Sequence, residues 1–136
     1  MNIISEKSHK TAQRVVCIYD FLAILPLAIP FVNSEHLATM GLINEVLGGD
    51  NWPSFSAIPL LFVQLLGVIG TGWTIWRWRN MSVKLGVFEG ILRLFVALVL
   101  LMAFFELQQP LLAVFGVMDI LLALPLIIIG KSLSTE

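Results

Sequence analysis

Charged side chains are scarce in this chain of 136 residues. Asp, Glu, Lys and Arg make up 12% of it, against roughly 25% in an ordinary soluble domain. Hydrophobic residues make up 58%. A soluble domain of this length needs a polar shell, and this composition holds too few polar residues to build one. The scarcity therefore excludes a soluble enzyme and predicts a protein that lies in a lipid bilayer.

The chain also lacks excess positive charge, paired cysteines and the common catalytic motifs. Its 8 Lys and Arg and 9 Asp and Glu give a net charge of −1, so a nucleic-acid partner is not expected. Cys17 is the only cysteine, which excludes a disulfide within the chain. His9 and His36 are far apart, and no metal site is predicted. Phosphate-binding, dinucleotide-binding and zinc-protease motifs are missing, so no cofactor can be named.

Long apolar runs are what the chain has instead. Four of them, 15–32, 59–76, 85–105 and 110–129, have the length of about 20 residues that a membrane helix requires. No run alternates polar and apolar residues as a barrel strand would. The sequence therefore predicts an all-α membrane protein of one domain, a four-transmembrane-helix bundle that runs up-down-up-down.

The basic residues indicate how the bundle is oriented. Seven of the 8 fall on one side: Lys7, Lys10 and Arg14 before the first span, Arg77, Arg79 and Lys84 between the second and third, and Lys131 after the fourth. The opposite loops hold no Lys or Arg and carry four acidic residues, namely Glu35, Glu45, Asp50 and Glu106. Because Lys and Arg accumulate in cytoplasmic loops, we expect a multi-pass protein of the cell membrane with both termini in the cytoplasm.

The long outer loop, 33–58, contains the signals of a short helix. Asn33 or Ser34 can cap its start, Glu35 suits its first turn, and Gly48 with Gly49 can end it. Its apolar residues fall on one face, and these are Leu37, Met40, Ile43 and Leu47. The pattern predicts a short interfacial helix that lies on the outer membrane surface.

Several polar residues lie inside the apolar runs. Asp20, Glu89, Arg93 and Asp119 are ionisable, and such a group costs about 2.5 to 3.5 kcal/mol at the centre of a membrane helix. They are therefore candidates for binding a ligand or a proton. Three further candidates are Gln64, which could instead join two helices, and Tyr19 and Trp73, which could line a cavity.

Spacing along the third and fourth spans predicts which of these groups meet. Glu89 and Arg93 are four residues apart and share a helix face. Gly86 and Gly90 lie on the same face, which predicts close packing against the first span, the fourth span or a second subunit. The short turn 106–109 makes the last two spans a hairpin, which brings Arg93 within reach of Asp119. Asp20 could approach the pair from the first span.

Three carboxylates and one guanidinium in these spans sum to −2. Such an imbalance in a low-dielectric bundle needs compensation. One or two carboxyls could be protonated, a cation or cationic ligand group could lie among them, or water could enter from the cytoplasmic side. The groups then form either an internal network that fixes the helix register or a site for a ligand or a proton.

Three functions are compatible with these observations. The first is binding of an amphipathic or lipid-soluble small molecule, such as a quinone, isoprenoid or lipid, in a polar intramembrane pocket, by a protein that acts alone or as an accessory subunit. The second is proton- or cation-coupled transport by a homo-oligomer formed through Gly86 and Gly90. The third is a membrane enzyme of the isomerase or cyclase type that uses a protonated carboxyl as general acid.

The layout of the chain resembles that of several small bacterial membrane families, among them the DoxX-like proteins. The shared features are the four spans, the two ends inside and the long first outer loop. No signature motif is matched residue by residue, so the resemblance assigns neither a function nor a site residue.

Overall fold

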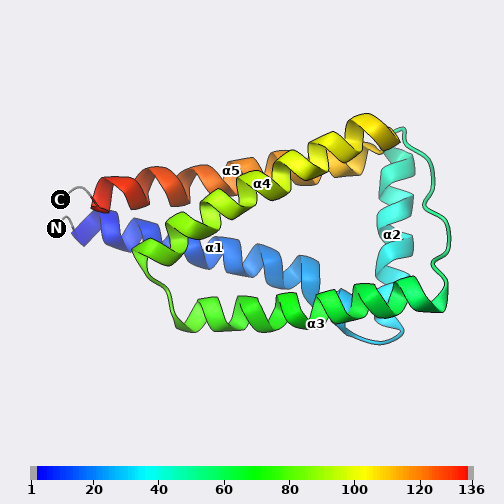
Figure 1. The fold of residues 1–136 in the computed structure, drawn as a ribbon, viewed down its shortest axis with the longest axis horizontal. Coiled ribbons are helices and arrows are strands. Elements are labelled where there is room, and N and C mark those ends of the chain that lie inside the picture. The colour runs from blue at the N-terminus through cyan, green and yellow to red at the C-terminus, as the bar shows by residue number, and fades with distance from the viewer. Residues whose placement is uncertain (1–2, 135–136) are drawn as a thin grey trace.

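Five helices make up the described part of the chain, residues 3–134 of a computed structural model. They are α1 (Ile3–Ala28), α2 (Val32–Val46), α3 (Ala57–Arg79), α4 (Val83–Leu107) and α5 (Pro110–Ser134). All except α2 are long and apolar enough to cross a membrane. Figure 1 shows these four running up-down-up-down, with both ends of the chain at one end of the bundle. The predicted four-helix membrane fold is confirmed.

Helix α1 differs from the predicted span at both ends. It begins 12 residues before the apolar run, because His9 and Gln13 are buried against the other helices. The His9 ring contacts the carbonyl oxygen of Leu126 at 3.1 Å, and the Gln13 amide donates to His9 Nδ1 at 3.0 Å and to the Ser82 carbonyl oxygen at 2.7 Å. The predicted end at 32 was wrong, because α1 stops at Ala28, shortly before Pro30.

Small residues let the spans approach one another closely. At Gly90 of α4, an added Cβ would lie 2.6 Å from Ile127 and 3.0 Å from the carbonyl oxygen of Ala123 on α5. At Gly67 of α3 it would lie 2.5 to 2.9 Å from the backbone of α1. The bundle therefore contains two tightly packed helix pairs, α4 with α5 and α1 with α3, and α1 also packs on α5.

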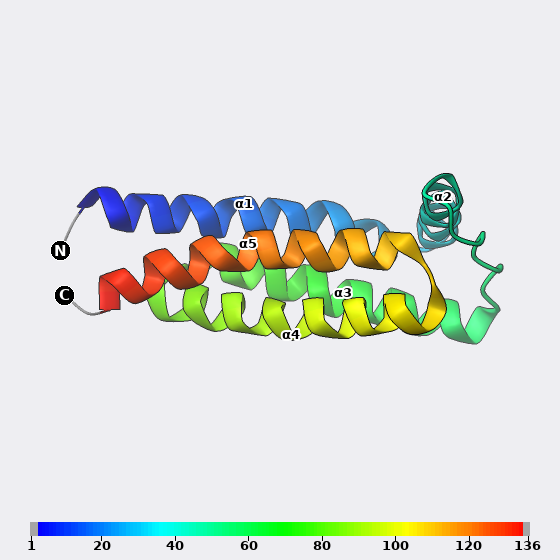
Figure 2. The same cartoon turned by 90° about the horizontal axis from the view of Figure 1, so that it is seen from above.

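Helix α2 lies across the end of the bundle that is opposite the termini (Figures 1 and 2). The residue that caps its start is Phe31, whose φ is 67° and whose side chain makes no capping hydrogen bond, so the predicted cap by Asn33 or Ser34 was wrong. The buried side chain of Asn44 holds it in place. The Asn44 amide donates to the Asp50 carbonyl oxygen at 2.7 Å and to Gln109, and its oxygen accepts from the Leu111 N–H at 3.0 Å. These bonds fix α2 to the turn between α4 and α5.

Helices α3 and α4 diverge from the short connection between them, residues 80–82 (Figure 1). They scarcely contact each other, whereas each packs along its other neighbour. Many large apolar side chains on their outer faces are exposed, such as Leu66 at 67% and Val99 at 65%. Acyl chains rather than water suit such a surface. The hollow between α3 and α4, which residues of both helices line, is called the lateral opening.

Candidate functional site

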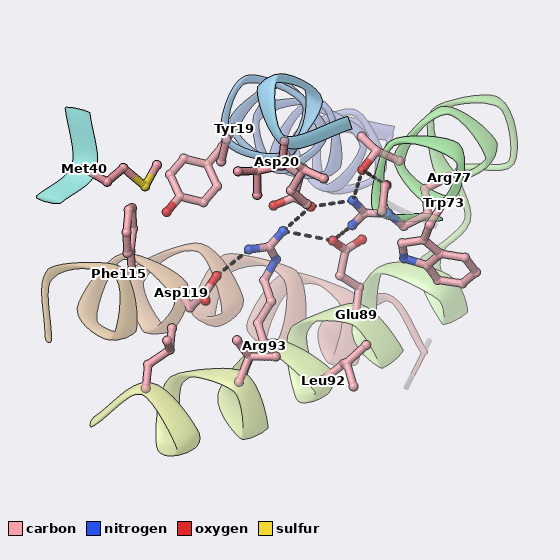
Figure 3. Close-up of a pocket in the computed structure, with 17 residues that line it drawn as sticks. Tyr19, Asp20, Met40, Trp73, Arg77, Glu89, Leu92, Arg93, Phe115 and Asp119 are labelled. Atoms are coloured by element: carbon pink, nitrogen blue, oxygen red, sulfur yellow. Dashed lines mark hydrogen bonds and ion pairs between the residues drawn. The ribbon is translucent and has the colours of Figure 1, made fainter. Parts of the chain in front are cut away.

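All four spanning helices contribute a charged side chain to one buried cluster. It consists of Asp20 from α1, Arg77 from α3, Glu89 and Arg93 from α4, and Asp119 from α5. None of these residues is more than 8% exposed. Groups that are far apart in the sequence thus meet inside the bundle (Figure 3). We call these five residues the charge cluster.

Arg93 is the centre of the charge cluster. Its Nη1 donates to Oδ1 of Asp119 at 2.5 Å, and its Nη2 donates to Oε1 of Glu89 at 3.3 Å and to Oδ2 of Asp20. One guanidinium therefore contacts three carboxylates. The expected contacts of Arg93 with Asp119 and with Glu89 are both present, and Asp20 approaches from the first span.

Arg77 is the member that sequence reasoning missed. We assigned it to the loop after the second span, but α3 continues to Arg79 and the Arg77 side chain points into the bundle, 3% exposed. It contacts the same Asp20 oxygen as Arg93 and the same Glu89 oxygen, and it donates to the Thr74 hydroxyl at 3.2 Å. Asp20 and Glu89 are therefore each shared by two guanidiniums, whereas Asp119 contacts Arg93 alone.

Arg77 changes the charge balance of the site. Three carboxylates and two guanidiniums sum to −1 when all are ionised, so the sequence-based value of −2 was wrong. One uncompensated negative charge is left within the described residues of the cluster. A single proton or one hydrogen-bonded or cationic ligand group is sufficient to offset it.

A pocket of about 410 Å³ extends from the charge cluster toward α2. It lies between α3 and α4, with α1 and α5 as its floor. Tyr19 and Trp73 line it, as the sequence led us to expect, and Met40 of α2 and Phe115 of α5 close its far end (Figure 3). The remaining lining residues outside the cluster are small or apolar apart from Thr74: Ala23, Ile24, Leu27, Gly70, Leu92, Val96 and Leu100.

Three other candidates lie outside this pocket. Gln64 is half-buried on α3 and does not line the pocket. Gly86 packs against α1, where an added Cβ would lie 2.4 Å from Gln13 and 2.5 Å from His9, while Gly90 packs against α5. Both glycines are covered by helices of their own chain. The suggestion that they join two subunits was therefore wrong.

One pattern in the sequence could have identified the residues of α3 that face the site. Gly67, Gly70, Thr74 and Arg77 recur at intervals of three and four along α3, which places them on one face. Three small residues on the face that ends in Arg77 indicate that this face packs against protein. The tryptophans on either side, Trp76 and Trp78, obscured the pattern because they suggest an interfacial position.

The fold and the pocket define a small multi-pass helical membrane protein with a charged site among its spans. Comparison of the chain with models of protein families, with curated proteins and with solved structures found no match. The resemblance to the DoxX-like proteins is therefore one of layout, and the function is argued from the pocket.

Proposed function

We propose that this protein binds a lipid-soluble small molecule that has a polar end, in the pocket between α3 and α4. The polar end lies against the charge cluster, and the apolar part lies along Leu92 and Val96 toward the lateral opening. A pocket of about 410 Å³ is large enough for such a molecule. The observation that carries the proposal is this cavity, which has apolar walls and the charge cluster at one end.

The charge balance of the cluster limits which chemical groups can form the polar end of the bound molecule. Because the cluster has one more carboxylate than guanidinium, a group that donates hydrogen bonds stabilises it better than one that only accepts them. A quinol, an isoprenoid alcohol or a lipid with a hydroxyl or amine headgroup meets this requirement. We propose that the protein presents such a molecule to a partner enzyme as an accessory subunit.

The distribution of charge supports an orientation for this binding protein. Lys7, Lys10, Arg14, Arg79, Lys84 and Lys131 all belong to the end of the bundle that carries the termini, and Glu35, Glu45, Asp50 and Glu106 to the opposite end. By the preference of Lys and Arg for cytoplasmic segments, both termini lie in the cytoplasm and α2 lies at the outer surface of the cell membrane.

Filling the pocket tests the proposal. Val96 lines it and is 44% exposed, so Val96→Trp places an indole in the lateral opening. Val99 is on the same helix, is 65% exposed and does not line the pocket, which makes Val99→Trp the matched control. Native mass spectrometry of protein extracted with its lipids should show a small molecule bound to the unchanged chain and to Val99→Trp. Val96→Trp should have lost it.

Absence of any molecule that distinguishes these two variants would contradict the proposal. Decylubiquinol, the reduced form of a short-chain quinone, is a probe for the quinol class, because its two hydroxyl groups can donate hydrogen bonds to the charge cluster. Decylubiquinol bound to the unchanged chain and to Val99→Trp, but not to Val96→Trp, in native mass spectrometry would assign the pocket to quinols. Equal binding to all three proteins would exclude quinols and leave the isoprenoid and lipid classes.

A further inference from the structure

A second hollow, of about 310 Å³, lies between α1 and α3. Ile18 and Leu22 of α1 and Ile75 of α3 form its walls and are 48 to 69% exposed. Buried Cys17 also lines it. This groove shares only Thr74 with the pocket described above, which lies between α3 and α4. Its walls match an acyl chain, because they are apolar and open to the lipid.

One end of the groove is basic. Arg79, the last residue of α3, lines it together with Trp78, which is 47% exposed. Arg14 of α1 lies one helical turn from Ile18 on the same face, toward the termini. Neither arginine has an ion-pair partner among residues 6–133, and no carboxylate lines the groove. The apolar groove thus ends at two positive charges that have no counter-ion among these residues.

We infer that this groove binds an anionic phospholipid. One acyl chain lies along Ile18, Leu22 and Ile75, and the phosphate lies at Arg79, whose guanidinium can hold two phosphate oxygens at once. The Trp78 indole lies at the level of the headgroup, where indole rings are favoured. A positive site between membrane helices selects an anionic headgroup over a zwitterionic one with the same chains. The inference does not rest on the proposed function of the other pocket.

The test compares two lipids and two charge changes. Full-length protein is reconstituted in nanodiscs that contain equal amounts of palmitoyl-oleoyl phosphatidylglycerol and phosphatidylcholine, and native mass spectrometry counts the lipids that stay bound. We expect one phosphatidylglycerol per chain in preference to phosphatidylcholine. Arg79→Gln should weaken this preference about fivefold, as expected for one basic residue near the surface. Lys84→Gln removes the same charge from α4 outside the groove and should leave the preference unchanged.

Two tryptophan substitutions distinguish binding in the groove from a general attraction of anionic lipids to the basic surface of the protein. Ile18→Trp fills the groove, whereas Val15→Trp changes an exposed residue of α1 that does not line it. Loss of the bound phosphatidylglycerol in Ile18→Trp alone supports the inference. Equal retention of the two lipids by the unchanged protein, or equal loss in Arg79→Gln and Lys84→Gln, would overturn it and leave ordinary surrounding lipid as the explanation.

Discussion

At the scale of the residue, the two arginines of the charge cluster have unequal roles. Arg93 contacts all three carboxylates, and it is the only partner of Asp119 in the cluster. Arg77 contacts two carboxylates that Arg93 also contacts. Loss of a buried charge is most costly when it leaves an opposite charge without compensation. The effect of a substitution should therefore follow the net charge that remains in the cluster.

We expect Arg93→Gln to destabilise the protein strongly and Asp119→Asn to do so only weakly. Removing Arg93 changes the cluster from −1 to −2 and leaves Asp119 without a partner, which should lower the free energy of unfolding by about 3 to 5 kcal/mol. Asp119→Asn brings the cluster to zero and keeps a side chain that can accept the Arg93 hydrogen bond. Unfolding by sodium dodecyl sulfate in mixed micelles, followed by tryptophan fluorescence, measures both changes.

Lys84→Gln is the control for this comparison, because Lys84 is exposed and does not belong to the charge cluster. If Asp119→Asn were as destabilising as Arg93→Gln, hydrogen-bond geometry rather than charge balance would determine the stability of the site.

The sequence was sufficient to predict the pairing of Arg93 but not the burial of Arg77. Glu89 is one helical turn from Arg93, and a short hairpin connects Arg93 to Asp119, so local geometry determines both contacts. Arg77 reaches Asp20 and Glu89 only because α3 packs on α1 and its last turn faces α4. Those are contacts between distant segments, and no periodicity within one span specifies them.

At the scale of the element, close packing of α4 depends on the absence of side chains at particular positions. Gly90 lies against the backbone and side chains of α5, so even one methyl group there has no room. Gly72 on α3 has open space where its Cβ would be. The two glycines are both within spanning helices and differ in their surroundings, which separates the effect of packing from the effect of helix propensity.

Gly90→Ala should destabilise the protein by about 1 to 3 kcal/mol, because the added methyl group forces α4 away from α5. Gly72→Ala should be neutral or stabilise it by up to about 1 kcal/mol, because alanine favours a helix more than glycine does. Thermal unfolding in detergent measures both. Equal effects of the two changes would show that α4 and α5 are not in close contact at Gly90.

Element boundaries were predictable only where apolar residues define them. The last two spans, 85–105 and 110–129, lie within α4 and α5 because the apolar runs are nearly as long as the helices. The first 12 residues of α1 were missed because His9 and Gln13 are polar, and their burial depends on partners in α5 and in the connection before α4. Polar residues that pair across the bundle cannot be distinguished in sequence from those that face water.

At the scale of the whole molecule, the two ends of the bundle differ in charge. The end with the termini is basic and the end with α2 is acidic. This asymmetry follows from the up-down order of the helices, because each connection between two spans lies at one end of the bundle, and the charged residues beside it lie at the same end. The number of spans and their up-down alternation followed from the sequence, since apolar length is a property of whole segments and tolerates errors of several residues. The orientation of the bundle in the membrane stays a prediction.

Cysteine labelling of intact cells measures the orientation of the protein in the membrane. In a Cys17→Ala background, Ser54→Cys is in the connection after α2 and Lys84→Cys is at the start of α4. A maleimide that does not cross membranes should label Ser54→Cys in intact cells and Lys84→Cys only after the membrane is opened. The opposite pattern would place both termini outside.

The hydrogen bonds of Asn44 have a consequence for which molecules can enter. They fix α2 to the turn between α4 and α5, and α2 also contacts α3. At the opposite end of the bundle, Arg77 of α3 forms an ion pair with Glu89 of α4. Contacts therefore link α3 and α4 near both ends of the lateral opening. We expect the width of this opening to change little when a molecule binds. The cross-section of a ligand would then be selected at the lateral opening before its polar end meets the charge cluster. Bulky lipids would be excluded at that opening.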